Sequence, residues 1–153
     1  MNPCQARRRR LLAACLLMAC VPHASAQSEA NGRDGRLEIL KLTLAAGADL
    51  KSTNRYGGTA LIPACHHGHV EVVHELLKTS IAVDHVNKLG WTALLETVIL
   101  GDGSARYRDI ARLLLEHGAS PAIADREGVT PLAHAQRRGH REMLALLQAA
   151  ARQ

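Results

Sequence analysis

The sequence contains no phenylalanine, and tryptophan and tyrosine together supply only three of its 153 residues. A core with so few aromatic rings must be built from Leu, Ile, Val and Ala. Hydrophobic residues make up 47% of the chain and charged residues 22%, which is the balance of an ordinary soluble protein. The length leaves room for about one domain.

Long hydrophobic runs are also absent. The longest, residues 11–21, has eleven residues, too few to cross about 30 Å of hydrocarbon as a helix. It follows the basic cluster 7–10 and precedes the small-x-small tripeptide 24–26, an order typical of a secretory signal peptide. We therefore expect residues 1–26 to be a signal peptide that directs the chain to the bacterial periplasm. We expect no membrane span in the remainder.

The leader leaves a second form of export open. Residues 17–20 resemble a lipobox that ends at Cys20, and residues 8–12 weakly resemble a twin-arginine export signal. Cleavage after Ala26 would release the protein, whereas lipidation at Cys20 would anchor it as a lipoprotein.

Beyond the leader the chain has one cysteine and little net charge. Cys4, Cys15 and Cys20 lie within residues 1–26, so only Cys65 remains, and a single thiol forms no internal disulfide. The leader also holds four of the 19 Lys and Arg, which leaves 15 against 14 Asp and Glu. Such a balance produces no long-range field toward phosphate backbones, so we expect no nucleic-acid partner.

The body of the chain repeats itself. The segments that begin at Asn54, Asn87 and Asp125 share Gly three residues on, Thr five on, Leu seven on and Gly fourteen on. The first two starts are 33 residues apart and the last two 38, and the five extra residues match an insertion at 102–106. A period of this length indicates a repeat architecture.

Three stretches identify the repeat: Gly-Val-Thr-Pro-Leu at 128–132, Leu-Leu-Glu-His-Gly-Ala at 114–119 and Leu-Ala-Ala-Gly-Ala-Asp at 44–49. They resemble the two halves of the ankyrin repeat, over about residues 35–150. The resemblance implies an all-α solenoid of helix-turn-helix units with β-turn fingers, about three and a half repeats long, that binds proteins without catalysis. The chain also resembles small exported bacterial ankyrin proteins made of a leader and a few repeats.

This resemblance divides the chain after the leader into four parts. They are a partial repeat at 27–53, a repeat at 54–86, a repeat with the insertion at 87–124, and a C-terminal capping repeat at 125–153. In the last part Gln136 and Gln148 replace apolar residues, as suits a terminal repeat whose outer face has no neighbour.

Local signals place the helices. Thr59, Thr92 and Thr130 each precede an apolar stretch, where a hydroxyl accepts from free N–H groups, and Pro131 suits the first helical position. Pro63 lacks the N–H that would bond the Thr59 carbonyl, which predicts a local distortion.

The second helix of each repeat carries apolar residues at helical spacing, at 72–77 and 110–115. Gly47 and Gly118 follow such helices and can take the left-handed conformation that ends them. Ser80 stands in place of this glycine in the second repeat, which predicts a different helix end there.

The stretch Cys65-His66-His67-Gly68-His69 suggests a metal site or a nucleophile with its base. Cys65 aligns with a tight packing position of the repeat, so we interpret it as a small buried hydrophobe. Adjacent residues on a helix point in different directions, which argues against His66 as its base.

The histidines and the lack of other motifs leave one chemical alternative. Gly68 turns the chain between His67 and His69, against the geometry of a metal site, although imidazole is a common ligand. A metal or haem-associated protein that uses His66, His67 and His69 therefore remains an alternative. No phosphate loop, paired carboxylates or catalytic triad appears, so we expect neither an enzyme nor a cofactor.

Exposed residues of the fingers and first helices form the predicted partner-binding site on the concave face. Tyr56 falls on a finger, Trp91 immediately before a first helix and Tyr107 beside the insertion, and none occupies a core position of the repeat. These rings are expected either to decorate the surface and pack between neighbouring fingers or to serve as aromatic anchors for a partner. The predicted site comprises Arg55, Tyr56, His66, His67, Lys88, Leu89, Trp91, Arg126, Glu127 and Arg137, with Glu96, Ile99 and Arg138 beside them.

The function expected from this surface is noncatalytic binding of an unidentified protein by a monomer. The face is amphipathic and mildly basic, which suits a partner with acidic surface better than a small molecule. An immunity or sequestering protein for a co-encoded toxin or enzyme is a further alternative within the same class.

Overall fold

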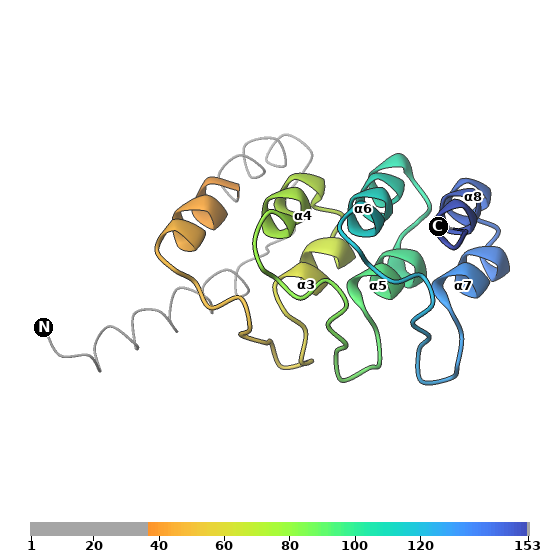
Figure 1. The fold of residues 1–153 in the computed structure, drawn as a ribbon, viewed down its shortest axis with the longest axis horizontal. Coiled ribbons are helices and arrows are strands. Elements are labelled where there is room, and N and C mark those ends of the chain that lie inside the picture. Colours follow the sequence, from red (N-terminus) through yellow and green to blue (C-terminus); the bar gives the residue numbers. More distant parts are fainter. Residues whose placement is uncertain (1–36, 153) are drawn as a thin grey trace, which may run out of the picture. The chain divides into compact units, whose positions relative to one another are not determined.

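The computed structural model describes residues 37–152 (Figure 1). The chain forms two compact units that divide between Ser52 and Thr53. The described part of the first unit contains a helix at 37–45 and the turn that follows it. The predicted signal peptide, its cleavage after Ala26 and the alternative lipidation at Cys20 lie outside the described residues.

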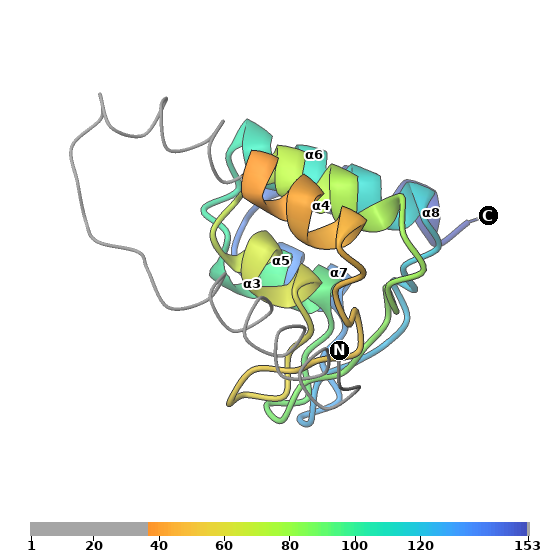
Figure 2. The same ribbon diagram turned by 90° about the vertical axis from the view of Figure 1, so that its left-hand side faces the viewer.

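The second unit contains three helix pairs. They are α3 (Leu61–His66) with α4 (Val70–Leu77), α5 (Ala93–Leu100) with α6 (Ala105–Glu116), and α7 (Pro131–Arg137) with α8 (Arg141–Ala150). Within this unit α3, α5 and α7 pack in one row and α4, α6 and α8 in a second row (Figures 1 and 2). The residues from 37 to 152 include no strand. The predicted all-α class and helix-turn-helix repeats are confirmed.

A tight turn, the finger, precedes each first helix and is closed by the side chain that opens the repeat. In the third repeat Asn87 Oδ1 accepts hydrogen bonds from the N–H groups of Leu89 at 2.9 Å and Trp91 at 3.0 Å. Asn54 and Asp125 close the other two fingers in the same way. The Asn or Asp at the start of each repeat therefore sets the shape of its finger.

The first helices of the third and fourth repeats begin at threonine caps, as predicted. The Thr92 and Thr130 hydroxyls accept from the N–H groups of Leu95 at 3.2 Å and Ala133 at 3.3 Å. Pro131 occupies the first turn of α7, where a missing N–H costs nothing.

The helix α3 departs from this pattern, and the prediction that Thr59 caps it through its side chain is wrong. Thr59 Oγ1 is buried, with no hydrogen-bond partner among residues 37–152. In α5 and α7 the residue four after the threonine donates its N–H to the threonine carbonyl, but Pro63 has none. The Thr59 carbonyl accepts from Ile62 N–H instead, at 3.2 Å, so this N–H no longer serves the hydroxyl. The distortion predicted at Pro63 is confirmed.

The second helices bury the predicted apolar residues. Val73, Leu76 and Leu77 of α4 are buried, as are Ile110 and Leu114 of α6. Val72 of α4 and Leu113 and Leu115 of α6 are half-buried. These aliphatic side chains and those of the first helices form the core of the second unit.

Glycines in the left-handed conformation end two of the second helices. Gly47 and Gly118 have φ of 78° and 88°, in the left-handed region, as predicted. The helix α4 ends differently, because the Thr79 hydroxyl donates a 2.5 Å hydrogen bond to the Leu76 carbonyl and Ser80 does not adopt positive φ.

The insertion at 102–106 does more than lengthen a turn. The helix α6 begins at Ala105 and has 12 residues, against 8 in α4, so part of the insertion extends the helix. Tyr107, expected outside the core, is 7% exposed, and its hydroxyl donates to the His66 carbonyl at 2.9 Å. The expectation that Tyr107 lies outside the core is therefore wrong, because the extended helix carries this ring into the interface with the second repeat.

In the last repeat Gln136 and Gln148 are both exposed, as expected for the outer face of a terminal repeat. The repeat boundaries at 27–53, 54–86, 87–124 and 125–153 stay predictions.

Candidate partner-binding site

The fingers are joined to one another by basic side chains. The Lys88 ammonium donates to the Arg55 carbonyl at 3.1 Å, across 33 residues of sequence. The Arg126 guanidinium donates in turn to the Lys88 carbonyl. Each of these cations directly follows the Asn or Asp that closes its finger, so the repeat places Arg55, Lys88 and Arg126 in equivalent positions. We call these three residues the cation ladder.

Glycine gives the ladder its room. A Cβ atom on Gly90 would lie 2.6 Å from Cγ of Arg126, and one on Gly57 would lie 3.0 Å from Cγ of Lys88. Gly90 also has a φ of 86°, which a side chain would strain. The repeat glycine therefore allows the next finger's cation to lie flat on the preceding finger.

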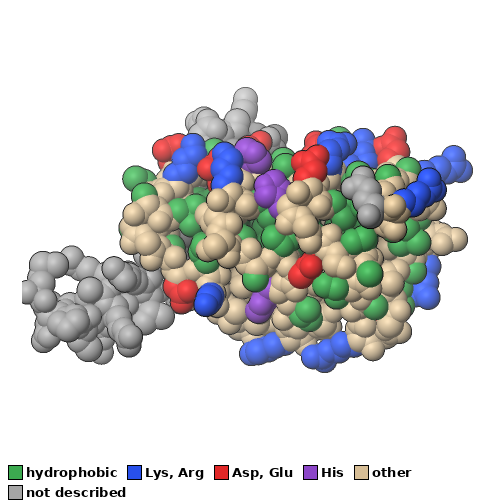
Figure 3. All heavy atoms as spheres, in the orientation of Figure 1, with side chains coloured by type: hydrophobic (Ala, Val, Ile, Leu, Met, Phe, Trp, Pro, Cys, Tyr) green, Lys and Arg blue, Asp and Glu red, His purple; other side chains and the backbone are tan. Residues whose placement is uncertain are grey.

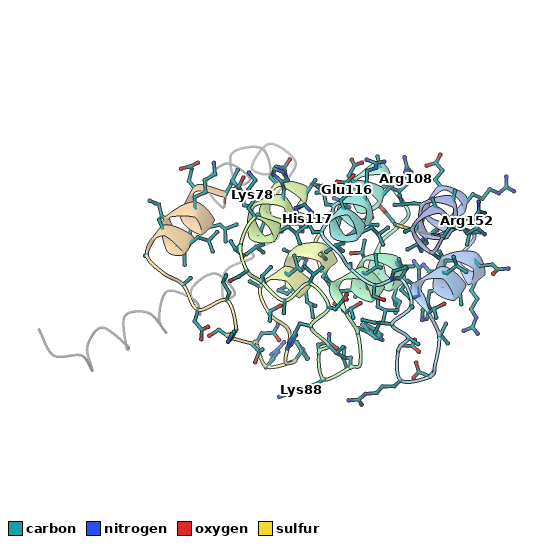
Figure 4. All side chains as sticks on the ribbon, in the orientation of Figure 1. Lys78, Lys88, Arg108, Glu116, His117 and Arg152 are labelled. Carbon is teal, nitrogen blue, oxygen red and sulfur yellow. The ribbon has the colours of Figure 1, made fainter. Side chains whose placement is uncertain are left out.

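The ladder cations keep their charge uncompensated. None of them forms an ion pair within residues 37–152, whereas Lys78 pairs with Glu75 at 2.7 Å on the opposite side. Figure 4 shows Lys88 at the tip of a finger and Lys78 at the other edge of the second unit. Figure 3 shows Lys and Arg side chains along the lower edge, where the fingers end. A bond to a neutral carbonyl orders a cation but leaves its charge free for an anion.

Apolar side chains lie beside the ladder. Tyr56 is 50% exposed and Leu89 is 47% exposed, and the Arg55 guanidinium lies 4.7 Å from the centre of the Tyr56 ring. Trp91 is half-buried and Glu127 exposed. The finger row therefore combines cations with accessible apolar surface.

The ends of the first helices complete the predicted site. His66, His67 and Arg137 are exposed. Glu96, expected beside them, is buried, with 9% of its side chain exposed, and its Oε1 lies 3.0 Å from Nδ1 of His66. Its second oxygen has no hydrogen-bond partner among residues 37–152. The expectation that Glu96 contributes to the open face is wrong, because His66 lies over the carboxylate.

The histidine cluster lacks the arrangement of a metal site. The centres of the His66 and His67 rings are 4.6 Å apart and their planes are inclined by 62°, and the centres of the His67 and His69 rings are 5.9 Å apart. In the part of the chain that the structure describes, no three His, Cys, Asp or Glu side chains converge to hold an ion.

Cys65 is fully buried, as predicted. Loss of solvent raises the pKa of its thiol to about 12, with a smaller contribution from the Glu96 charge, against a lowering by a hydrogen bond from Thr97. A thiol with such a pKa is protonated at neutral pH and makes a poor nucleophile.

Residues on either side of the insertion contact the last repeat. Arg138 donates to the Gly101 carbonyl at 3.1 Å, and Arg108 donates to the Gly103 carbonyl at 3.1 Å and pairs with Glu142 at 2.5 Å. An open cavity of about 280 Å³ lies here between the insertion and the start of α8. No pattern in the sequence indicates these contacts.

The bonds of the cation ladder were also missed, although a signal for them exists. Aligning the repeats shows a basic residue directly after the Asn or Asp in all three complete repeats. Sequence analysis predicted these residues only as exposed contacts for a partner. That all ten residues of the predicted site contact a partner stays a prediction.

No helix among residues 37–152 is long and apolar enough to cross a membrane.

Two family models of ankyrin repeats match the chain, one for three copies over residues 26–125 and one for many copies over residues 106–148. The ankyrin repeat protein YahD of Escherichia coli strain K12 is 48% identical over 115 residues, which are 74% of this chain and 57% of that protein. An ankyrin repeat-containing protein of Treponema pallidum strain Nichols is 28% identical over 142 residues, 92% of this chain and 46% of that protein.

Solved structures are similar as well. An ankyrin repeat domain from Acinetobacter baumannii AYE matches with a TM-score of 0.75 and 58% identity, over 78% of this chain and 61% of that one. The ankyrin repeat protein EF0377 matches with a TM-score of 0.72 and 42% identity, over 76% of this chain and 60% of that one. The chain thus spans about 60% of the length of these two chains.

Proposed function

The chain belongs to the ankyrin repeat family, and from that premise we propose that its finger row and first-helix ends bind a partner protein. Ankyrin repeats are generally noncatalytic protein-interaction modules. The observation that supports this surface is the cation ladder, whose charges form no ion pair within residues 37–152 and lie beside the exposed Tyr56 and Leu89, with Lys88 and Arg126 ordered by hydrogen bonds between fingers.

Rigidity is the mechanism of this binding. The fingers are closed by their own Asn and Asp side chains and bonded to one another. A partner that docks on them immobilises few new rotamers, so less of the contact energy is lost to ordering. Tyr56 and Trp91 are the aromatic anchors of this proposal, and the chain acts as a monomer.

The proposed location is the periplasm. The order of basic cluster, apolar run and small residues within 1–26 supports export, and the alternative is a lipoprotein anchored at Cys20. N-terminal sequencing of the protein from fractionated cells distinguishes a chain that starts at Gln27 from one blocked at Cys20.

A photo-crosslinking residue at position 89 tests the binding surface. Leu89 is exposed on a finger, whereas Arg112 is exposed on α6 and pairs with Asp109 of the same helix, which makes position 112 the matched control. We expect one specific protein adduct from position 89 in the native compartment, and none from 112. Adducts of the same kind from both positions would contradict the finger row as the binding surface.

A further inference from the structure

We propose that the cation ladder binds an acidic segment of a partner protein in polyproline II conformation, with one carboxylate at each of the three fingers. This inference rests on the proposed function and names the chemistry of the partner. Its basis is that Arg55, Lys88 and Arg126 are equivalent in the repeat and lack ion pairs within residues 37–152. Lys88 and Arg126 are ordered by finger-to-finger hydrogen bonds, and the Arg55 guanidinium lies over the Tyr56 ring of its own finger.

The spacing of the ladder selects the conformation of the bound segment. Neighbouring packed helices lie about 8–10 Å apart, and the fingers that precede them follow the same spacing. A polyproline II helix has three residues per turn and rises about 3.1 Å per residue, so every third side chain returns to one face after about 9.3 Å.

Other conformations fit less well. In a β-strand, residues three apart point to opposite faces, so the carboxylates could not all reach the ladder. An α-helix rises about 1.5 Å per residue, so its acidic residues would have to lie about seven positions apart, and it would need more than twice as many residues to reach the same three fingers. Acidic residues at every third position of an extended segment therefore match the three fingers.

The apolar neighbours of the ladder suit the residues between the carboxylates. Tyr56 and Leu89 each expose about half of their surface next to a ladder cation, and proline rings of a polyproline II segment pack on such aromatic and apolar surface. A phosphate backbone offers no apolar groups at this spacing. Three cations also provide few of the contacts from which nucleic-acid affinity is built.

A labelled peptide tests the inference. We expect (Glu-Pro-Pro)3, measured by fluorescence anisotropy on the purified chain, to bind at least tenfold more tightly than a permuted peptide with its three Glu adjacent, and than (Gln-Pro-Pro)3. Added salt should weaken the binding, because exposed charges are screened. Equal binding of the permuted peptide, or tighter binding of single-stranded DNA, would overturn the proposal.

Variants identify the cations. Lys88→Gln should weaken binding by up to about fivefold, the upper end of what one exposed ion pair contributes, and the triple variant with Arg55→Gln and Arg126→Gln by up to about a hundredfold. Lys88→Arg keeps the charge and a donor for the Arg55 carbonyl and should retain affinity. Lys78→Gln, at the opposite edge, should change nothing. Circular dichroism verifies that each variant is folded, and full affinity in a folded Lys88→Gln variant would sink the proposal.

The outcomes also separate this inference from the proposed function. If position 89 crosslinks a specific partner but none of the acidic peptides binds, the surface is right and the acidic segment is wrong. If neither result is obtained, both proposals fail.

Discussion

At the scale of single residues, Asp125 does by a charge what Asn54 and Asn87 do by a neutral amide. The backbone N–H of Val129 is the main cause that holds the pKa of the Asp125 carboxyl below its usual value, and His134, 2.7 Å away, adds to it. Loss of solvent opposes this lowering. Of the three side chains that close the fingers, Asp125 is therefore the one that titrates.

A lowered folded-state pKa gives stability that is present above the unfolded value of about 3.9 and is lost as the pH falls through the folded value. We expect Asp125→Asn to lower the thermal midpoint at pH 6, because the hydrogen bonds from Val129 and to His134 lose the negative charge of their acceptor. Below pH 4 the difference should shrink, because the wild-type carboxyl becomes neutral. Thermal unfolding of both proteins from pH 6 to pH 2 measures this, and a difference that does not vary with pH would contradict it.

Positions in the repeat predicted the environment of some residues but not of others. Cys65 was predicted to be buried, because it aligns with a packing position that every repeat shares. The burial of Glu96 and Tyr107 was not predicted. A carboxylate is normally exposed, and only the three-dimensional placement of His66 covers Glu96. Tyr107 follows an insertion with no counterpart in the other repeats, so no alignment could show which way it faces.

At the scale of the elements, one proline changes how a helix begins. Thr92 and Thr59 occupy the same position in consecutive repeats and are both buried, at 0% and 3% exposure. The Thr92 hydroxyl accepts from Leu95, while the Thr59 hydroxyl has no partner among residues 37–152 because Pro63 displaces its donor. The threonine pattern predicted both helices, but the proline decides which cap forms.

Substituting valine for threonine keeps nearly the same side-chain shape and removes the hydroxyl. We expect Thr92→Val to lower the free energy of unfolding by about 1 kcal/mol, the usual contribution of a cap. Thr59→Val should be neutral or stabilising, since it removes a buried polar group that has no partner. Urea unfolding of the two variants and the wild type measures both effects.

The two variants, Thr92→Val and Thr59→Val, serve as controls for each other, since the two substitutions are chemically identical. A loss of about 1 kcal/mol in both variants would show that Thr59 has a partner after all, and would refute the account of Pro63.

At the scale of the whole molecule, the repeat period predicted the fold, whereas the insertion could be recognised only as extra residues. Whether an insertion is a free loop or packs against a neighbour depends on side chains that lie far apart in sequence. Here Arg138 reaches the Gly101 carbonyl across 37 residues, and Arg108 pairs with Glu142 of α8. Neither contact recurs in the other repeats, so the repeat pattern of the sequence does not predict it.

These contacts couple the last repeat to the one before it. The stability of a solenoid is approximately the sum of its repeats and of the interfaces between neighbours, and a terminal repeat has only one interface. We therefore expect the double variant Arg108→Ala with Arg138→Ala to unfold its last repeat separately. The single tryptophan, Trp91, reports on the third repeat, while circular dichroism reports on all helices.

In the wild type, the two signals should change at the same urea concentration. In the double variant, the loss of helical signal should begin at lower urea than the change in Trp91 fluorescence. Arg112→Ala provides the control, because Arg112 lies on the same helix α6 and its ion pair within residues 37–152 is with Asp109 of that helix. The two transitions of this variant should stay coincident. Coincident transitions in the double variant as well would mean that the insertion does not couple these repeats, and that aliphatic packing between the helices suffices.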